Sequence, residues 1–333
     1  MLKKVKTKIK WGSLPAEVKD LFKGLQHFLT RSLVQIAVKE DLNIVLKDPV
    51  KVAEIAKEKG YTDLGILDYY LRTLAILGVL EEPEPHKFVW KGHDLRISTY
   101  ERLFLEKSTP FAPKLSEYAG FLPKALKGAR IRREEGFLAI MDAIYSSQFY
   151  TSLISAALEK GQELPNNTIF DVCGYTGWGS ITMADTFQEI DQIFFIEPDA
   201  QSLAVAKENL SNLGITDKVS IDFVETNPWE ELPKTKTGLI FGLELFQRTD
   251  PKDYEKLLKL CFESLEEEGK FISIQPSRLD PHEPFSYEVL LLVKQDFRGF
   301  PSQENLLQQL AMAGFENIAI LENFVILAEK PSK

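Results

Sequence analysis

From residue 168 to the end of the chain, short apolar segments alternate with amphipathic ones, and this alternation constrains the fold most. Strands separated by helices indicate a doubly wound α/β sheet that is mostly parallel. Only two or three residues separate the last two apolar segments, which is too few for a crossover helix, so these strands must pair antiparallel. The expected strands are 168–172, 192–196, 218–224, 238–242, 270–275, 316–320 and 323–328, and the expected helices are 178–187, 199–212, 251–267 (ending at Gly269) and 302–313.

The first hundred residues predict a separate, helical domain. Apolar residues recur at three-to-four spacing over 14–42 and over 62–80, which is typical of amphipathic helices. Between them, Asp48 indicates the start of another helix and Gly60 its end. The Pro-rich turn in "EEPEPHKFVW" (81–90) then predicts a β-hairpin. Three helices followed by a hairpin give the winged-helix order.

The third of these helices does not suit DNA. Winged-helix proteins place that helix in the major groove, where it meets phosphates. Between Leu64 and Leu80 the chain carries one Arg and one Asp, and the other residues are apolar, Tyr, Thr or Gly. The formal net charge of −9 also argues against nucleic acid. We therefore expect no nucleic-acid partner and predict a homodimer formed through this apolar helix.

The composition excludes other classes of protein. A chain of 333 residues with 44% hydrophobic and 27% charged residues is typical of a globular protein with two domains. No apolar run approaches the thickness of a bilayer, and the basic start lacks the apolar core of a signal peptide. We predict no membrane partner and a cytoplasmic location. The two cysteines, Cys173 and Cys261, do not suggest a disulfide framework.

Residues 101–160 predict helices that connect the two domains. The segment 134–161 places Met141, Tyr145 and Phe149 on one face or its edges. Two interpretations remain open. The face is either an ordinary core stripe or, because the helix leads directly to the first strand of the sheet, the lining of a pocket for an apolar or aromatic ligand.

Six segments of the chain together resemble one known family. In their order and spacing they are similar to the two-domain small-molecule O-methyltransferases, of which the chain is identified as a divergent member over nearly its whole length. The segments are "YLRTLAILGVLEE" (70–82), "TIFDVCGYTG" (168–177), "FFIEPDAQSLAVAKENL" (194–210), "FVETNPWEELP" (223–233), "LIFGLELFQRTDPKDYEKLL" (239–258) and "GFPSQENLLQQLAMAGFENIAIL" (299–321).

The resemblance implies a domain arrangement and a cofactor. Residues 1–100 would form a winged-helix-like dimerisation domain, and 101–160 would be connecting helices that line the substrate pocket. Residues 161–333 would form a class I, Rossmann-like methyltransferase domain that binds S-adenosylmethionine. The resemblance implies no metal.

The first cofactor motif departs from the family pattern Asp-x-Gly-x-Gly-x-Gly. The corresponding residues here are Asp171, Cys173, Tyr175 and Gly177, so only the last glycine is kept. Gly174 and Gly177 can still bring the backbone close to a ligand. The side chains of Cys173 and Tyr175 add bulk. The rings of Tyr175 and Trp178 either face the sulfonium, a cation that aromatic faces attract, or pack under the loop.

Glu197 ends the second strand, where the resemblance implies that its carboxylate accepts hydrogen bonds from both ribose hydroxyls. Asn227 stands where the family commonly has Asp for the adenine amine, and an amide oxygen can accept the same bond. The implied cofactor-binding residues are Asp171, Cys173, Gly174, Tyr175, Gly177, Glu197, Pro198, Asn227, Pro228 and Gly242.

The loop after the fourth strand lacks the base of the plant-type phenol methylators. Those enzymes have a His at the position of Phe246, which Gln247 follows here, and neither residue accepts a proton at neutral pH. We predict methyl transfer to a small apolar or aromatic acceptor without a His base. His282 and Glu244 are the remaining candidates for a catalytic group. The predicted substrate-binding residues are Met141, Tyr145, Phe149, Phe246 and Gln247.

Other functions remain open at this point. One is a divergent S-adenosylmethionine-binding protein with a regulatory role or other chemistry, and another is a winged-helix regulator that senses a ligand. The stretch "GWGSIT" (177–182) is also close to a dinucleotide fingerprint. Its glycines come four residues after the strand, however, and the terminal antiparallel pair disfavours a nicotinamide dehydrogenase.

Overall fold

The computed structural model describes residues 12–93, 95–132, 137–161, 163–187, 189–280, 284–295, 297 and 299–332. The chain divides into two compact units, which we call the sheet unit and the wing unit. The sheet unit comprises Met1–Val18, Leu138–Ser277 and Phe300–Lys333. The wing unit comprises Lys19–Phe137 and Arg278–Gly299. The second segment of the wing unit lies between two parts of the sheet unit in the sequence.

A seven-stranded sheet forms the centre of the sheet unit, in the order β6-β5-β4-β7-β8-β10-β9. The first five strands in this order run parallel, and β10 pairs antiparallel with both β8 and β9. This arrangement confirms the predicted doubly wound sheet with an antiparallel end. The strands are β4 (Thr168–Val172), β5 (Gln192–Ile196), β6 (Ser220–Val224), β7 (Thr237–Leu243), β8 (Leu265–Ile274), β9 (Glu316–Leu321) and β10 (Val325–Glu329).

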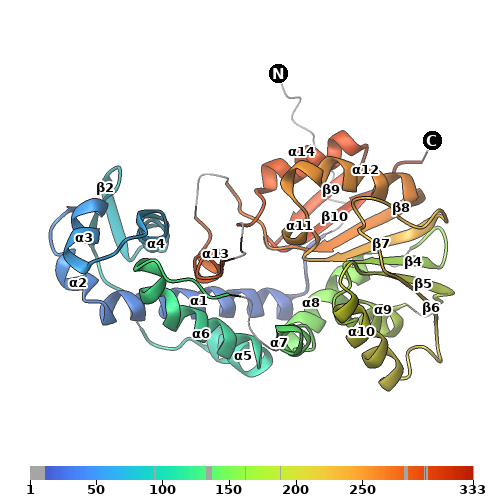
Figure 1. Cartoon of the computed structure of the whole chain (residues 1–333), viewed down its shortest axis with the longest axis horizontal. Coiled ribbons are helices and arrows are strands. Elements are labelled where there is room, and N and C mark those ends of the chain that lie inside the picture. Colours follow the sequence, from blue (N-terminus) through green and yellow to red (C-terminus); the bar gives the residue numbers. More distant parts are fainter. Residues whose placement is uncertain are drawn as a thin grey trace. The chain divides into compact units, whose positions relative to one another are not determined.

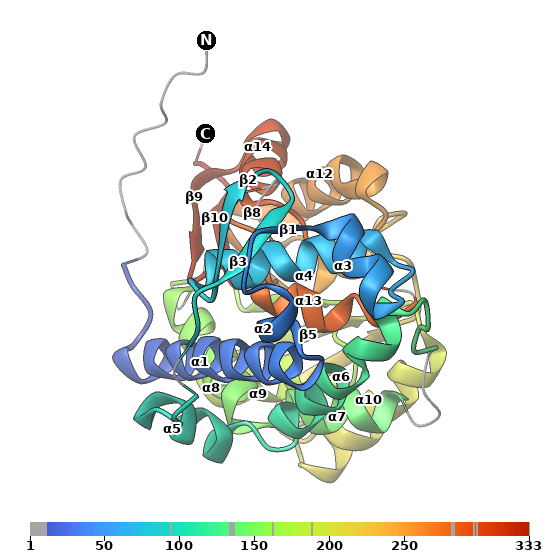
Figure 2. The ribbon, with the colours of Figure 1, turned by 90° about the vertical axis from the view of Figure 1, so that its left-hand side faces the viewer.

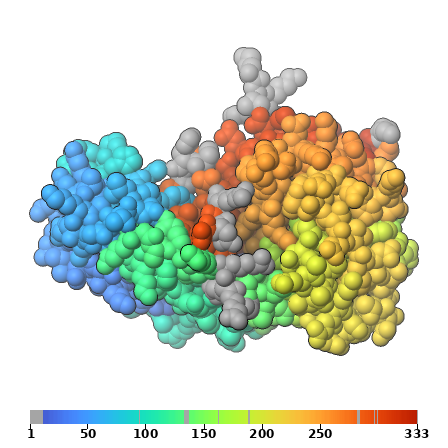
Figure 3. Space-filling model, viewed as in Figure 1, coloured from blue at the N-terminus to red at the C-terminus, as the bar shows by residue number. Residues whose placement is uncertain are grey.

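Helices cover both faces of this sheet (Figure 1). Successive strand residues point to opposite faces. Phe194 therefore packs in the cluster with Leu257 and Leu306, and Phe195 in the cluster with Leu210. In the space-filling view, the outer side of α10 lies on the surface of the unit (Figure 3). The helices are α7 (Phe137–Tyr145), α8 (Gln148–Leu158), α9 (Trp178–Thr186), α10 (Ala200–Asn212), α11 (Leu245–Arg248), α12 (Tyr254–Ser264) and α14 (Gln303–Ala313), with 3₁₀ turns at Glu159–Gly161 and Pro251–Asp253.

The wing unit contains helices and a three-stranded sheet of order β1-β3-β2. Its hairpin, β2 with β3, confirms the predicted wing. The helix α13, which follows the sheet unit's β8 in sequence, lies beside α4 and α6 (Figure 2). The elements are α1 (Ala16–Lys39), which begins just before this unit, α2 (Leu42–Val45), β1 (Val50–Lys51), α3 (Val52–Lys59), α4 (Leu64–Ile76), β2 (Leu80–Glu84), β3 (Lys87–Trp90), α5 (Thr99–Lys107), α6 (Phe111–Leu126) and α13 (Ser286–Leu291).

Most of the apolar surface of α4 is used inside the wing unit. Tyr70 and Leu71 are fully buried, and the hydroxyl of Tyr70 donates to the carbonyl of Leu33 at 2.7 Å. Leu64 and Ile76, at the ends of the helix, are about half exposed (50% and 54%). The helix therefore offers less free apolar surface to a second copy than its sequence suggests.

Three local predictions were wrong, two of them because non-local strand pairing replaced a local signal. Asp48 does not begin a helix, because residues 50–51 form β1 against β3 and α3 starts at Val52. The segment 251–267 leaves the helical conformation after Ser264, because Leu265 already pairs with β7, and Gly269 lies inside β8. The long helix expected at 134–161 breaks at Ser147 into α7 and α8.

Within the described residues, no helix combines the length and the apolar character needed to cross a bilayer.

Candidate functional site

Three neighbouring parallel strands, β5, β4 and β7, end at the same edge of the sheet, which is where ligands bind in open α/β sheets. The loop 173–177 follows β4, Glu197 follows β5, and α11 follows β7. The residues that the sequence singled out around the cofactor motif therefore do come together at one edge of the sheet.

The loop after β4 holds two non-glycine residues in the left-handed region of the backbone. Cys173 has a φ of 58° and Tyr175 a φ of 51°, a conformation that strains side-chain-bearing residues. Backbone hydrogen bonds hold it in place, because Cys173 N–H donates to the Ile196 carbonyl at 2.8 Å and Gly177 N–H to the Gly174 carbonyl at 3.0 Å. Burial raises the pKa of the Cys173 thiol to about 12, so the thiol is neutral.

The glycines of this loop are needed for packing within the protein. A Cβ on Gly174 would come within 2.3 Å of the Phe195 ring. Gly177 has a φ of 93°, and its Cα faces Leu210 of α10. These glycines let the loop lie close against β5 and α10, so their presence alone is no evidence of room for a ligand.

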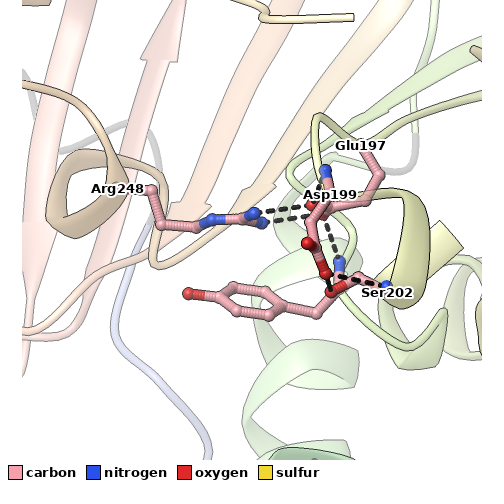
Figure 4. Close-up of polar contacts among 5 residues, drawn as sticks. Glu197, Asp199, Ser202 and Arg248 are labelled. Carbon is pink, nitrogen blue, oxygen red and sulfur yellow. Dashed lines mark hydrogen bonds and ion pairs between the residues drawn. The ribbon is translucent and has the colours of Figure 1, made fainter. Parts of the chain in front are cut away.

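Glu197 lies at the centre of this edge, and its carboxylate is completely buried. The backbone N–H of Tyr175 donates to Oε2 and that of Asp199 to Oε1, both at 3.0 Å. The guanidinium of Arg248 approaches from α11 and forms two parallel hydrogen bonds, of 2.7 Å to Oε2 and 2.6 Å to Oε1 (Figure 4). Asp199 also caps α10 by accepting from Ser202. Glu197 thus has four donors and a compensating positive charge.

The same guanidinium lies over an aromatic ring. The Arg248 Cζ is 4.4 Å from the centroid of the Tyr175 ring, a cation–π geometry. Tyr175 in turn packs against Tyr145, with 5.2 Å between centroids, and Tyr145 against Tyr150. Phe149 packs edge-on to Tyr150. Two of the predicted pocket residues, Tyr145 and Phe149, therefore belong to one buried aromatic cluster with the loop residue Tyr175.

Asp171 lies in β4 behind this loop and has no exposed surface. Ser180 Oγ donates to its Oδ2 at 2.6 Å, while Oδ1 has no hydrogen-bond partner among the described residues. Burial raises the pKa of this carboxyl to about 7, and the charge of Glu197 adds to the shift. Gly179 of α9 closes over it, since a Cβ there would lie 3.0 Å from Oδ2. Asp171 is therefore sealed between strand and helix.

The far side of the loop is tied to α7 by Asp142. Its Oδ1 accepts from the Trp178 indole at 2.8 Å and from the Asn209 amide at 2.7 Å. Asn209 also donates to the Thr176 carbonyl at 3.0 Å. These bonds connect α7, α9, α10 and the loop, and they fix its position.

The residues after β7 are held in the core. Glu244 is buried, has a φ of 51° and accepts from the Tyr150 hydroxyl at 3.2 Å. Phe246 is 1% exposed, and its N–H donates to Gln275 Oε1 at 3.0 Å. Its carbonyl accepts from the Tyr254 hydroxyl.

Gly242 is buried within β7, where a Cβ would come within 3.1 Å of the side chain of Leu245, the first residue of α11. Gln247 is half-buried, and His282 lies outside the described residues.

The other predicted residues lie as follows. Asn227 is half-buried and begins a turn, because its carbonyl accepts from the N–H groups of residues 230 and 231. Pro228 within that turn is buried, whereas Pro198 after β5 and Met141 on α7 are half-buried. Their roles in binding stay predictions.

Sequence reasoning missed Arg248, Tyr150 and Asp142. Arg248 directly follows Gln247, which was predicted to bind the substrate, so the prediction missed it by one position in the chain. The one available signal was a basic residue in the short segment that follows a buried strand. Nothing local indicates that its partner is an acid 51 positions earlier.

The placement of these residues fits a nucleoside cofactor, but their present hydrogen bonds do not. An ionised carboxylate has about four acceptor positions, and Glu197 uses all of them on protein donors. Ribose hydroxyls can bind this carboxylate only after the guanidinium of Arg248 has moved away from it.

The sheet with its antiparallel end, preceded by a winged helix, defines the fold of the two-domain O-methyltransferases with a class I methyltransferase domain. The O-methyltransferase family 2 protein from Planctomyces limnophilus, crystallised with apigenin, is 14% identical and has a TM-score of 0.53, with 96% of this chain and 98% of that one covered. The CurJ carbon methyltransferase is 11% identical, with a TM-score of 0.58 and coverages of 94% and 92%. The S-adenosylmethionine-dependent methyltransferase SibL is 12% identical, with a TM-score of 0.53 and coverages of 92% and 98%.

Comparison with protein-family models gives no match, and comparison with curated protein sequences gives none either. At identities this low, the structural similarity establishes the fold of both units, and the chemistry has to be argued from the site.

Proposed function

We propose that this protein is an S-adenosylmethionine-dependent methyltransferase that acts on a small apolar or aromatic acceptor. The observation that carries the proposal is the position of Glu197. A buried carboxylate at the end of β5 meets the loop after β4, and its Oε2 accepts the loop's Tyr175 N–H at 3.0 Å. Within this fold, that is where a cofactor ribose would be held.

Each residue of the site has a proposed part. Glu197 would accept from the ribose hydroxyls, and Asn227 would accept from the adenine amine. The ring of Tyr175 would face the sulfonium, as it now faces a guanidinium. The cofactor supplies a methyl group on that sulfonium. Gly174 and Gly177 shape the loop, and Asp171, sealed behind it, would act only through the loop's conformation.

The acceptor would be bound by aromatic side chains. Tyr145 and Phe149 belong to the buried cluster around Tyr175, and Phe246 and Gln247 lie on α11. Such surroundings suit an apolar or aromatic molecule and exclude water. The protein's main contribution would therefore be to position the acceptor for the transfer.

A His base is not part of the proposal. Phe246 occupies the position where related phenol methylators carry one, and Glu244 is buried with a Tyr hydroxyl as its donor. We expect Glu244→Gln and His282→Ala to leave the methylation rate within about tenfold. A thousandfold loss in either variant, with the cofactor still bound, would assign that residue as the base.

Calorimetric titration with S-adenosylmethionine and S-adenosylhomocysteine tests the proposal. Binding of both ligands, together with a lack of binding of NAD, is the expected result. The proposal fails if the folded protein binds neither ligand at millimolar concentration.

A second function, cofactor binding without methyl transfer, is favoured by the altered loop after β4, where Cys173 and Tyr175 stand at glycine positions of the family pattern, and by Phe246 at the position of the family's base. It predicts binding of S-adenosylhomocysteine and no methyl transfer to any acceptor in a panel of phenols, thiols and amines. Methylation of one of them contradicts it.

We also propose a homodimer formed through the wing unit. The exposed apolar ends of α4, Leu64 and Ile76, and the exposed Ile44 support it. An obligate interface buries on the order of 2,000 Å² or more. Sedimentation that shows a monomer at every concentration would contradict it.

A further inference from the structure

The carboxylate proposed to hold the ribose already has an occupant from the same chain. Arg248 presents two N–H donors to the two oxygens of Glu197, at 2.7 and 2.6 Å. Two vicinal ribose hydroxyls would present the same pattern, that is, a pair of donors to a pair of oxygens. The other two acceptor positions are taken by the backbone of Tyr175 and Asp199, which also build the loop.

Arg248 also takes the place of the cofactor's positive charge. Its guanidinium lies 4.4 Å from the centre of the Tyr175 ring, on the aromatic face proposed for the sulfonium. One side chain therefore satisfies both the carboxylate and the aromatic face, which are the two recognition elements of the proposed site.

We infer that Arg248 is an internal competitor of the nucleoside, which closes the cofactor site through its contacts with Glu197 and Tyr175 until a ligand displaces it. This inference rests on the proposed function, and it adds a residue that sets the affinity of the site and the exchange of its ligand.

The surroundings of Arg248 permit this displacement without unfolding. The backbone of α11 is anchored independently, because Phe246 N–H donates to Gln275 and the Phe246 carbonyl accepts from Tyr254. Thr249 Oγ1 donates to the Leu245 carbonyl as well. Arg248 is the last residue of this four-residue helix, and its side chain keeps 19% of its surface exposed. The proposed displacement therefore takes place by rotation about the side-chain bonds of Arg248 and breaks none of these anchoring hydrogen bonds.

The consequence for binding follows from competition. A ligand that must first break a bidentate, largely buried ion pair binds more weakly than one that enters a site without it. Removal of the guanidinium should therefore tighten nucleoside binding, although it removes a polar side chain from the site. An arginine that helped to hold the ligand would give the opposite result.

The test compares the affinity of S-adenosylhomocysteine for the full-length wild type, Arg248→Met, Arg248→Lys and the matched control Lys252→Met. Lys252 lies four residues further on, is exposed and pairs with Asp250, so its removal makes the same change in net charge outside the site. Calorimetry gives the affinities, and thermal unfolding with and without ligand checks that each variant is folded.

We expect Arg248→Met to bind at least tenfold more tightly than the wild type. Arg248→Lys, which keeps the charge but loses the bidentate pair, should lie between them, and Lys252→Met should equal the wild type. If Arg248→Met fails to fold, the comparison of Arg248→Lys with the wild type decides, and Arg248→Lys should bind the ligand more tightly. Equal or weaker binding by the folded Arg248 variants, beside measurable binding by the wild type, overturns the inference and leaves the proposed function standing. No binding by any folded variant overturns both.

Discussion

Two buried acids lie near the carboxyl ends of adjacent strands of the same sheet and have opposite environments. Asp171 in β4 and Glu197 after β5 are both completely buried. Glu197 has four donors, including a guanidinium. Asp171 has Ser180 as its side-chain donor, and its Oδ1 has no partner among the described residues. Burial raises the pKa of Asp171 to about 7, so near neutral pH it is partly protonated.

The difference comes from what can reach each carboxyl group. Asp171 lies within the strand, and Gly179 closes over it. Glu197 lies one residue beyond its strand, where α11 can bring in Arg248. The position of each acid along its strand thus decides its state. Beyond the strand end the acid is buried as half of an ion pair, and within the strand it is buried without a cation and partly protonated. In our inference, it is the ion-paired acid that exchanges its partner for a ligand.

The largest effect should come from removing the cation. Arg248→Met leaves the charge of Glu197 buried without compensation, and we expect the free energy of unfolding to fall by about 3–5 kcal/mol. Urea denaturation without ligand measures it. Adding Glu197→Gln should recover most of the loss, because the buried charge is then gone. A loss below about 1 kcal/mol in Arg248→Met would mean that the pair is effectively exposed to solvent.

Asp171 should make the free energy of unfolding depend on pH. Its folded pKa lies above the ordinary value of 3.8, so the folded state holds its proton to higher pH than the unfolded state does. Its contribution is therefore fully present below about pH 4 and is lost as the pH rises to about 7. At about 1.4 kcal/mol per pKa unit, the loss is at most on the order of 4 kcal/mol.

Asp171→Asn tests this sign. Relative to the wild type, the variant should become more stable between about pH 4 and pH 7 and change little above that, as measured by urea denaturation at each pH. A wild-type advantage that stays constant, or grows, over this interval would show that Asp171 ionises normally.

Ligand binding should separate the two acids further. In the Arg248→Met background, Glu197→Ala should weaken S-adenosylhomocysteine binding roughly 10–100-fold, the value of hydrogen bonds to a charged group. Asp171→Asn should change it less than about threefold, because the residue is sealed from the site. Similar losses in both variants, measured by calorimetry, would mean that the ligand reaches behind the loop.

A third acid provides the smallest expected effect. Glu244 is buried and accepts from a neutral donor, the Tyr150 hydroxyl, at 3.2 Å. We expect Tyr150→Phe to lower the free energy of unfolding by about 1 kcal/mol, because it removes one hydrogen bond and no charge. Thermal and urea unfolding measure it, with Phe149→Leu as a packing control. A loss as large as that of Arg248→Met would contradict this expectation and would mean that the Tyr150 hydroxyl stabilises Glu244 as strongly as the guanidinium stabilises Glu197.

Much of the sheet unit could be predicted because its signals are local. Seven apolar segments became seven strands, and the short connection before the last one enforced an antiparallel pair. The position of Glu197 after β5 and of Asp199 at the start of α10 also followed from local patterning. Helix ends were less predictable, since Leu265 left its helix in order to pair with β7.

The sequence by itself determined the order of the elements, the edge of the sheet at which the candidate site lies and the residues of its loop, because periodicity and strand–turn–helix patterns act over a few positions. Only the tertiary structure decided that Asp171 is sealed, that Glu197 is paired with Arg248 and that the segment 278–299 belongs to the wing unit. The physical reason is that burial and charge pairing depend on residues far apart in the chain. Glu197 could be found from its strand, whereas its partner lies 51 residues further on, and only the folding of the sheet brings it within 2.6 Å.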